Sequence, residues 1–179
     1  MSKRLFGFGL RSAARGAAAA LALWVFGATG AGVARAQDAG VRVNGTDVSA
    51  GSGDGWSRNG EEVILQRNGM TYVVDGTASG GSVRIVLMAN CTMVASNLAL
   101  SGGTPVSVYN GYSPVLELAG TNSFSGGGDC AGLGVPEGRS ITIRGDGALT
   151  ATGGYWGAGI GGGAYTNAGS ITIEGGTVS

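Results

Sequence analysis

Apolar and small residues alternate in short runs that recur along the C-terminal half of the chain. Segments 141–145 and 171–175 read Ile-Thr-Ile followed by a charged residue and glycine, and they begin 30 residues apart. Segment 116–120 is a looser copy, and segment 85–89 a weaker fourth one. A period of two indicates a β-strand with one buried face, and the closing glycine indicates a turn. Recurrence at this spacing predicts a solenoid, a propeller or a similar array.

Further strand signals surround this central strand. Segments 106–111 and 133–138 precede it, and short apolar phrases around Phe124, Leu149 and Val178 follow it. Coils of a β-solenoid stack about 4.8 Å apart, so alternation predicts continuous inward and outward ladders. The predicted inward ladders are Leu116, Ile141 and Ile171, and Leu118, Ile143 and Ile173, while Glu117, Thr142 and Thr172 stack outside.

The segment before the repeats gives weaker signals. Residues 37–60 are polar and glycine-rich, which predicts a linker or an N-terminal cap, and residues 61–179 form the predicted solenoid region. Apolar runs at 63–65 and 72–74 flank the sequence Arg67-Asn68-Gly69. A turn sequence between two apolar runs favours a β-hairpin.

The C-terminal coil carries two further expectations. Arg144 and Glu174 flank equivalent corners, where an exposed ion pair would add a little stability. The sequence stops at Ser179 within a strand phrase, so we expect an incomplete repeat region that continues in a longer protein. An uncovered last rung with Ile171 and Ile173 predicts end-to-end self-association, because an open strand edge is a template for pairing.

The N-terminus resembles a secretory signal peptide over residues 1–36. Lys3, Arg4, Arg11 and Arg15 precede an apolar run at 17–28, and small residues at 34 and 36 flank a predicted cut before Gln37. This run is shorter than the roughly 20 residues that a membrane-spanning helix needs. We therefore expect Sec-type export to the cell surface or the medium, with no membrane span in the mature chain.

Charge narrows the choice of partners. Five of the eleven basic residues precede Gln37 and all eleven acidic residues follow it, so the remainder has a net charge of −5 and contains no lysine. Nucleic acids and anionic membranes require clustered positive charge, so neither is an expected partner. The chain has no histidine, which excludes Ser-His-Asp and Cys-His catalysis and the usual imidazole zinc sites. We expect no cofactor and no metal.

The repeat region resembles a known group of proteins. The phrases at 118–122, 131–138, 145–147, 149–154 and 157–163 are similar to those of repetitive bacterial surface and secreted proteins, described as carbohydrate-binding-domain-containing proteins or β-helical adhesins. This resemblance covers roughly residues 82–179 and implies a right-handed parallel β-helix, similar in shape to pectate lyases. It implies a non-catalytic module that binds glycans or other cell-surface polymers. Fold similarity does not transmit the chemistry of the lyases.

An enzyme is the alternative. Turns of the repeat region carry the carboxylates Asp129, Glu137, Asp146 and Glu174, and Arg139 or Arg144 could serve as the base of a lyase. A glycosidase needs two carboxylates on either side of the scissile bond. Alternatively, the chain is an N-terminal fragment of a polysaccharide lyase or glycoside hydrolase whose active site lies beyond Ser179. The simpler interpretation is that these carboxylates are solvated corner residues of an acidic surface, since exposed carboxylates are the norm.

Aromatic side chains in the turns are the candidate ligand-binding residues. An aromatic ring can stack on the apolar face of a sugar while its polar tip forms hydrogen bonds. Covering the corners of the core is the competing interpretation. The residues are Tyr109, Tyr112, Tyr155, Trp156 and Tyr165.

Cys91 and Cys130 are the only two cysteines of the chain. An even number in an exported protein favours a disulfide bond, and adjacent coils could bring the pair together. Two separate buried thiols are the alternative.

Overall fold

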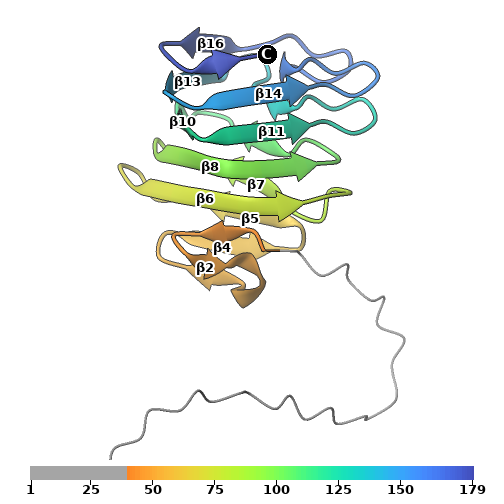
Figure 1. Ribbon diagram of the computed structural model, residues 1–179. Coiled ribbons are helices and arrows are strands. Elements are labelled where there is room, and N and C mark those ends of the chain that lie inside the picture. Colours follow the sequence, from red (N-terminus) through yellow and green to blue (C-terminus); the bar gives the residue numbers. More distant parts are fainter. Residues whose placement is uncertain (1–39) are drawn as a thin grey trace, which may run out of the picture. The chain divides into compact units, whose positions relative to one another are not determined.

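The computed structural model describes residues 40–179. The predicted signal peptide and its cleavage site lie outside the described residues and stay predictions. Apart from the 3-10 helix Val48–Ala50, the regular structure of the described chain is β, and its strands stack as parallel coils of about four turns (Figure 1). The predicted β-solenoid is therefore confirmed.

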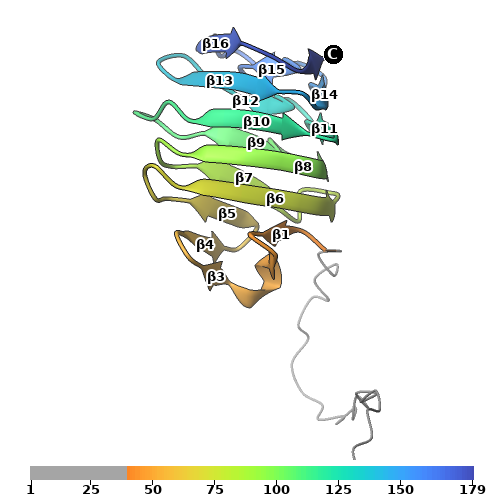
Figure 2. The ribbon, with the colours of Figure 1, turned by 60° about the vertical axis from the view of Figure 1, so that its left-hand side comes forward.

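Each coil passes through three faces, which we call faces A, B and C. Faces A and B belong to one hydrogen-bonded sheet, because β6 (Thr71–Ala78) and β8 (Thr92–Ser101) run through both. The sheet turns at Asn97, where β8 has one residue more than β6. Face C is the second sheet (Figure 2). The turns between faces are called the AB, BC and CA corners.

Strands of successive full coils are parallel on all three faces. Face A combines the first halves of β6 and β8 with β10 (Val115–Ala119), β13 (Ser140–Gly145) and β16 (Ser170–Ile173). Face B combines their second halves with β11 (Thr121–Ser125), β14 (Ala148–Thr152) and β17 (Thr177–Val178). Face C contains β5 (Glu62–Leu65), β7 (Arg84–Leu87), β9 (Val106–Val108), β12 (Leu133–Gly134) and β15 (Ile160–Gly161).

Short antiparallel strands precede the first full coil. β1 (Arg42–Val43) pairs with β2 (Thr46–Asp47) and with β6, while β3 (Ser52–Gly53) pairs with β4 (Trp56–Asn59), which pairs with β5. These strands lie at the end of the stack opposite the C-terminus (Figure 1). They therefore occupy strand edges of β5 and β6 that would otherwise be open to another chain.

The face A ladder has the predicted inward positions but a different register. Leu116 pairs with Ile143 instead of Ile141, whereas Ile141 and Ile143 stack on Ile171 and Ile173 as predicted. A shift of two residues leaves the same side chains inside. Ile143 is accordingly fully buried, between Leu116 and Ile173.

The same shift corrects the predicted ion pair. Glu117 pairs in register with Arg144 and not with Thr142. The Arg144 Nη2 and Glu117 Oε2 atoms are 3.0 Å apart, so Arg144 forms its ion pair with Glu117 and the predicted pairing with Glu174 is wrong.

Two local predictions are wrong as well. Segment 85–89 is no copy of the face A strands, because Ile85 belongs to β7 on face C, and the face A partner of Leu116 in the preceding coil is Met93. The turn at 67–69 does not close a hairpin. It joins β5 on face C to β6 on face A, and these two strands pair with other strands.

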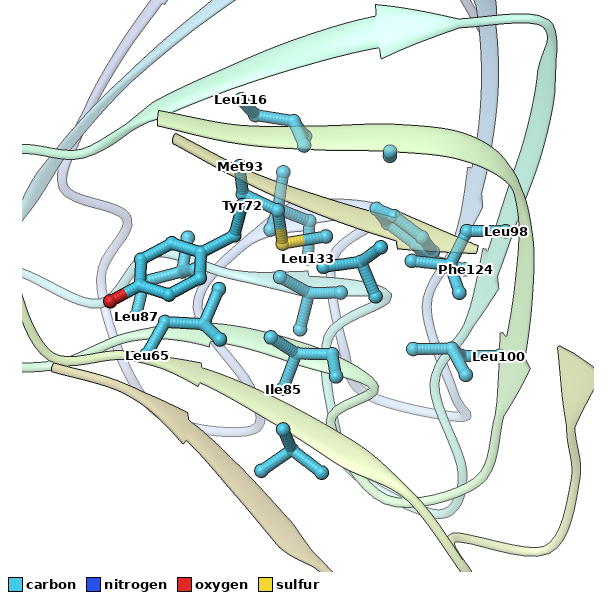
Figure 3. Packing of buried hydrophobic residues seen from close by; sticks show 14 of the residues in the cluster. Leu65, Tyr72, Ile85, Leu87, Met93, Leu98, Leu100, Leu116, Phe124 and Leu133 are labelled. Atoms are coloured by element: carbon cyan, nitrogen blue, oxygen red, sulfur yellow. The ribbon is translucent and has the colours of Figure 1, made fainter. Parts of the chain in front are cut away.

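The core is a column of apolar side chains enclosed by the three faces. Figure 3 shows Met93 and Leu116 of face A, Leu98 and Leu100 of face B, and Ile85 of face C directed into one interior. Most of these side chains are fully buried, and burial of a large aliphatic side chain contributes about 1.5–3 kcal/mol. The alternation seen in the sequence therefore supplies the main stabilising term of the fold.

Asparagine side chains hold two of the corners. At the CA corner, Asn68 Oδ1 accepts from the Asn90 N–H and Asn90 Oδ1 accepts from the Ser113 N–H, each at 2.8 Å. At the AB corner, Asn122 is 1% exposed and accepts from the Leu98 N–H at 2.9 Å. Each of these bonds joins adjacent coils and satisfies a backbone group that the turn would otherwise leave unpaired.

Candidate functional site

Three glycine-rich loops follow the face B and face C strands in the C-terminal coils. Residues 126–130 and 153–157 belong to the BC corner, and residues 162–166 follow β15. Each loop reverses direction through one backbone hydrogen bond, from the Cys130, Gly157 or Thr166 N–H to the carbonyl oxygen three residues earlier, at 3.1 to 3.2 Å. The loops thus share one turn design.

The loops pack against one another through their backbones. The Gly154 N–H donates to the Cys130 carbonyl oxygen at 2.9 Å, and the Tyr155 N–H donates to the Gly128 carbonyl oxygen. The Ala164 N–H donates to the Asp129 carbonyl oxygen at 2.8 Å. Loop 126–130 therefore lies against both of the other loops, and their tips gather at one place on the molecule.

Glycine is required for this close packing. A Cβ atom at Gly154 would lie 1.9 Å from the Gly128 carbonyl oxygen, and one at Gly157 would lie 2.0 Å from the Cys130 carbonyl oxygen. Side chains are excluded from these positions because backbone of the neighbouring loop fills the space. The remaining non-glycine positions are at the tips.

Three of the five predicted aromatic residues occupy those tips. Tyr155, Trp156 and Tyr165 are 84%, 62% and 99% exposed. The rings of Tyr155 and Trp156 meet edge to face, with centroids 5.0 Å apart and an interplanar angle of 86°. Tyr165 has a φ of +58°, a left-handed conformation that costs a non-glycine residue about 1–3 kcal/mol. None of the three covers the core.

The other two predicted aromatic residues lie elsewhere. Tyr109 and Tyr112 are in the CA corner that follows β9, where Tyr109 is 47% exposed and Tyr112 is half-buried. Arg139 donates from Nη1 to the Val108 carbonyl oxygen beside them at 2.6 Å. The structure thus places three of the five residues on loops that hydrogen-bond to loop 126–130, and the other two in the turn that follows β9.

The carboxylates considered for catalysis are dispersed. Asp146 and Glu174 lie at the AB corner, Asp129 in a BC loop, and Glu137 at the CA corner, where it accepts from Asn167 Nδ2 at 3.1 Å. Within residues 40–179, no group of three or more acidic or cysteine side chains could hold a metal ion. Asp146 and Glu174 thus share a corner in successive coils, whereas Asp129 and Glu137 lie at the other two corners.

The two cysteines are free thiols at different corners. Cys91 is buried at the CA corner before β8, and burial raises the pKa of its thiol to about 11. Cys130 is partly exposed in the loop after β11. A disulfide needs Cα atoms about 4.4–6.8 Å apart. The backbone partners of Cys130 are Gly127 and Gly154, and that of Cys91 is Val115, so stacking does not bring the two together.

The outer surface of face B is a further feature that the repeat pattern alone does not identify. Its outward positions carry hydroxyl or small side chains in every coil, for example Ser123 on β11 and Thr150 on β14, which are paired neighbours. Alternating Ser and Thr at 121–125 and 148–152 is the signal that could have revealed this surface.

Residues 40–179 contain no helix with the length and apolar character needed to cross a membrane. Evidence for a function comes from the loops and faces themselves. No protein-family model, no curated protein and no solved structure matches this chain.

Proposed function

We propose that this chain is a non-catalytic module, exported to the cell surface or the medium, that binds carbohydrate or mediates adhesion. The observation that carries the proposal is the cluster of exposed rings Tyr155, Trp156 and Tyr165 on loops that hydrogen-bond to the same neighbouring loop. Aromatic rings with a polar tip suit ligands that have both apolar faces and hydroxyl groups, as sugars do.

Two features of the rings favour recognition over packing. Exposed aromatic surface gains no burial energy, so three such rings on adjacent tips need another explanation than stability. Tyr165 also occupies a backbone conformation in which glycine would be favoured. Strain and exposure at the same residue are typical of sites kept for binding.

The glycine packing makes the loops suitable as a platform. Backbone hydrogen bonds from Gly154, Tyr155 and Ala164 tie the tips to loop 126–130, so little conformational freedom is left to lose when a ligand binds. Catalysis is not part of the proposal, since the chain has no histidine and its candidate carboxylates occupy three corners.

A glycan array with residues 37–179, followed by titration of the strongest ligand, tests the proposal. Trp156→Ala and Tyr155→Ala should each weaken binding at least tenfold. Tyr109→Ala is the matched control, because Tyr109 is also an exposed turn residue but follows β9, outside the loops that hydrogen-bond to loop 126–130. Failure to bind any glycan, or equal losses in all three variants, would contradict the proposal. Export is tested separately, by finding the mature chain with Gln37 as its first residue outside the cells.

Self-association through the last coil is a further part of the proposal. β15, β16 and β17 each pair with one strand only among the described residues, and Ile173 is 53% exposed. We expect sedimentation of residues 37–179 to show concentration-dependent dimers, and Ile173→Lys to shift them toward monomer. Unchanged association in Ile173→Lys would place the contact on another surface.

A further inference from the structure

The outer surface of face B carries no charged side chain at any outward position from Thr77 to Ser179. Its outward residues are Thr77 on β6, Asn97, Ala99 and Ser101 on β8, Thr121, Ser123 and Ser125 on β11, Ala148, Thr150 and Thr152 on β14, and Thr177 and Ser179 at the last strand. Parallel pairing aligns these side chains in rows, with neighbours about 4.8 Å apart.

The other two faces differ in charge. Face A has the ion pair of Arg144 with Glu117, and face C has the ion pair of Arg84 with Glu62, whose Nη2 and Oε1 atoms are 3.2 Å apart. Alternation within a strand does not distinguish the faces, because all three bury one row of apolar residues. Face B therefore differs from the other two faces in the side chains of its outer surface and not in its buried row.

Face B is also slightly hollowed. Thr77, Ala99, Ser101, Ser123 and Ser125 line a shallow open groove across β6, β8 and β11. A Ser or Thr hydroxyl can both donate and accept hydrogen bonds, as the hydroxyl groups of a sugar do. Five neighbouring strands span about 19 Å across the stack, which is longer than a single sugar ring.

The face leads directly into the aromatic loops. Thr152, the last outward residue of β14, is three residues before Tyr155, a separation of at most about 11 Å along the chain. Ser125 of β11 likewise precedes loop 126–130. A polymer lying along the hydroxyl rows can therefore reach the exposed rings of Tyr155 and Trp156 at the BC corner.

We propose that face B is a second contact surface that extends the aromatic loops and selects neutral polysaccharide chains over short oligosaccharides and over anionic polymers. This inference rests on the proposed function, because the loops supply the primary contact. Uncharged rows suit an uncharged polymer, and the net charge of −5 that follows Gln37 repels polyanions.

The experiment compares residues 37–179 with the double variant Ser123→Arg/Thr150→Arg. Both residues are exposed and outward-facing, so the substitutions place two long cations on the hydroxyl rows without touching the core. Thr172→Arg is the control, since Thr172 is an exposed, outward threonine on face A. The probes are microcrystalline cellulose as neutral polymer, cellobiose as its short counterpart and polygalacturonate as polyanion.

We expect the double variant to bind cellulose at least tenfold more weakly than the unmodified chain, while its affinity for cellobiose changes less than twofold. The Thr172→Arg variant should bind cellulose as strongly as the unmodified chain. Cellulose binding by the double variant at full strength, or equal binding of polygalacturonate and cellulose by the unmodified chain, overturns the inference. In both cases a tenfold loss of cellobiose affinity in Trp156→Ala leaves the proposed function standing. Absence of cellulose binding by the unmodified chain also overturns the inference, while the glycan array decides the proposed function independently.

Discussion

The AB and BC corners stabilise a change of chain direction in opposite ways. At the AB corner the turn is short, and Asn122 is buried to make three hydrogen bonds: from the Leu98 N–H and to the Ala119 and Ala148 carbonyl oxygens. At the BC corner the turn is long, and positions such as Gly154 and Gly157 must lack a side chain so that backbone can pack on backbone. One corner is fixed by a side chain and the other by its absence.

Because of this difference, the residues that stabilise the AB corner are buried, whereas the residues at the BC tips are accessible to a ligand. A side chain turned inward to satisfy buried backbone is unavailable to a ligand, whereas a loop held by its own backbone leaves its tip residues free to face solvent. Asn122, at the start of β11, is 1% exposed, whereas Tyr155, three residues after the end of β14, is 84% exposed. The comparison predicts that damage at the AB corner lowers stability and that damage at the BC tips lowers binding.

The largest loss of folding stability is expected for a charged substitution in the buried row of a strand. Ile143→Asp places an unpaired charge between Leu116 and Ile173 and should lower the free energy of unfolding by more than about 4 kcal/mol. Thr142→Asp, one residue away on the outer surface, should change it by less than about 0.5 kcal/mol. Urea denaturation followed by circular dichroism measures both, and equal stability of the two variants would show that the inward assignment of this strand is wrong.

The next largest effect is expected at the AB corner. Asn122→Ala leaves the Leu98 N–H and two carbonyl oxygens without their partner, and should lower the free energy of unfolding by about 3 kcal/mol. Ser123→Ala is the control, because Ser123 is the next residue of β11 and its side chain is exposed on the outer surface. A loss below about 1 kcal/mol for Asn122→Ala in the same denaturation experiment would mean that water replaces the buried side chain.

A smaller effect is expected in the BC loops. Gly157→Ala forces a Cβ against the Cys130 carbonyl oxygen and should lower the free energy of unfolding by about 1–3 kcal/mol. It should also weaken glycan binding, because loop 153–157 must move. Gly128→Asn is the control: the space around Gly128 is open and asparagine tolerates its φ of +55°. Equal melting temperatures for Gly157→Ala and Gly128→Asn would contradict the role of backbone packing.

The sequence predicts which residues form the strands of this fold, but it does not predict the residue offset between strands of successive coils. Alternation fixes which of Ile141, Thr142 and Ile143 point inward, because the period of a strand is two. It does not fix the offset between coils, because a slip of two residues buries the same set. The number of residues in the corner loops sets that offset, and it placed Leu116 against Ile143.

Turn sequences likewise do not predict how the flanking strands pair. A turn sequence such as Arg67-Asn68-Gly69 marks a change of direction but does not say whether the flanking strands pair or enter different sheets. The candidate site was predictable as aromatic residues in turns. The sequence does not predict which of these residues come together. Hydrogen bonds between coils bring together the loops 126–130, 153–157 and 162–166.

The last expected difference is in the chemical reactivity of the two thiols, which lie at the CA and BC corners. Cys130 belongs to a partly exposed BC loop, whereas Cys91 is buried and has a pKa of about 11, which leaves about one thiolate in ten thousand at pH 7. We expect a disulfide-forming thiol reagent to modify Cys130 within minutes in the folded protein and Cys91 only after unfolding in urea. Cys130→Ser should then leave no reactive thiol in the folded chain. Two protected thiols would mean that the loops close over Cys130, and two missing thiols in urea without reductant would mean that the cysteines form a disulfide after all.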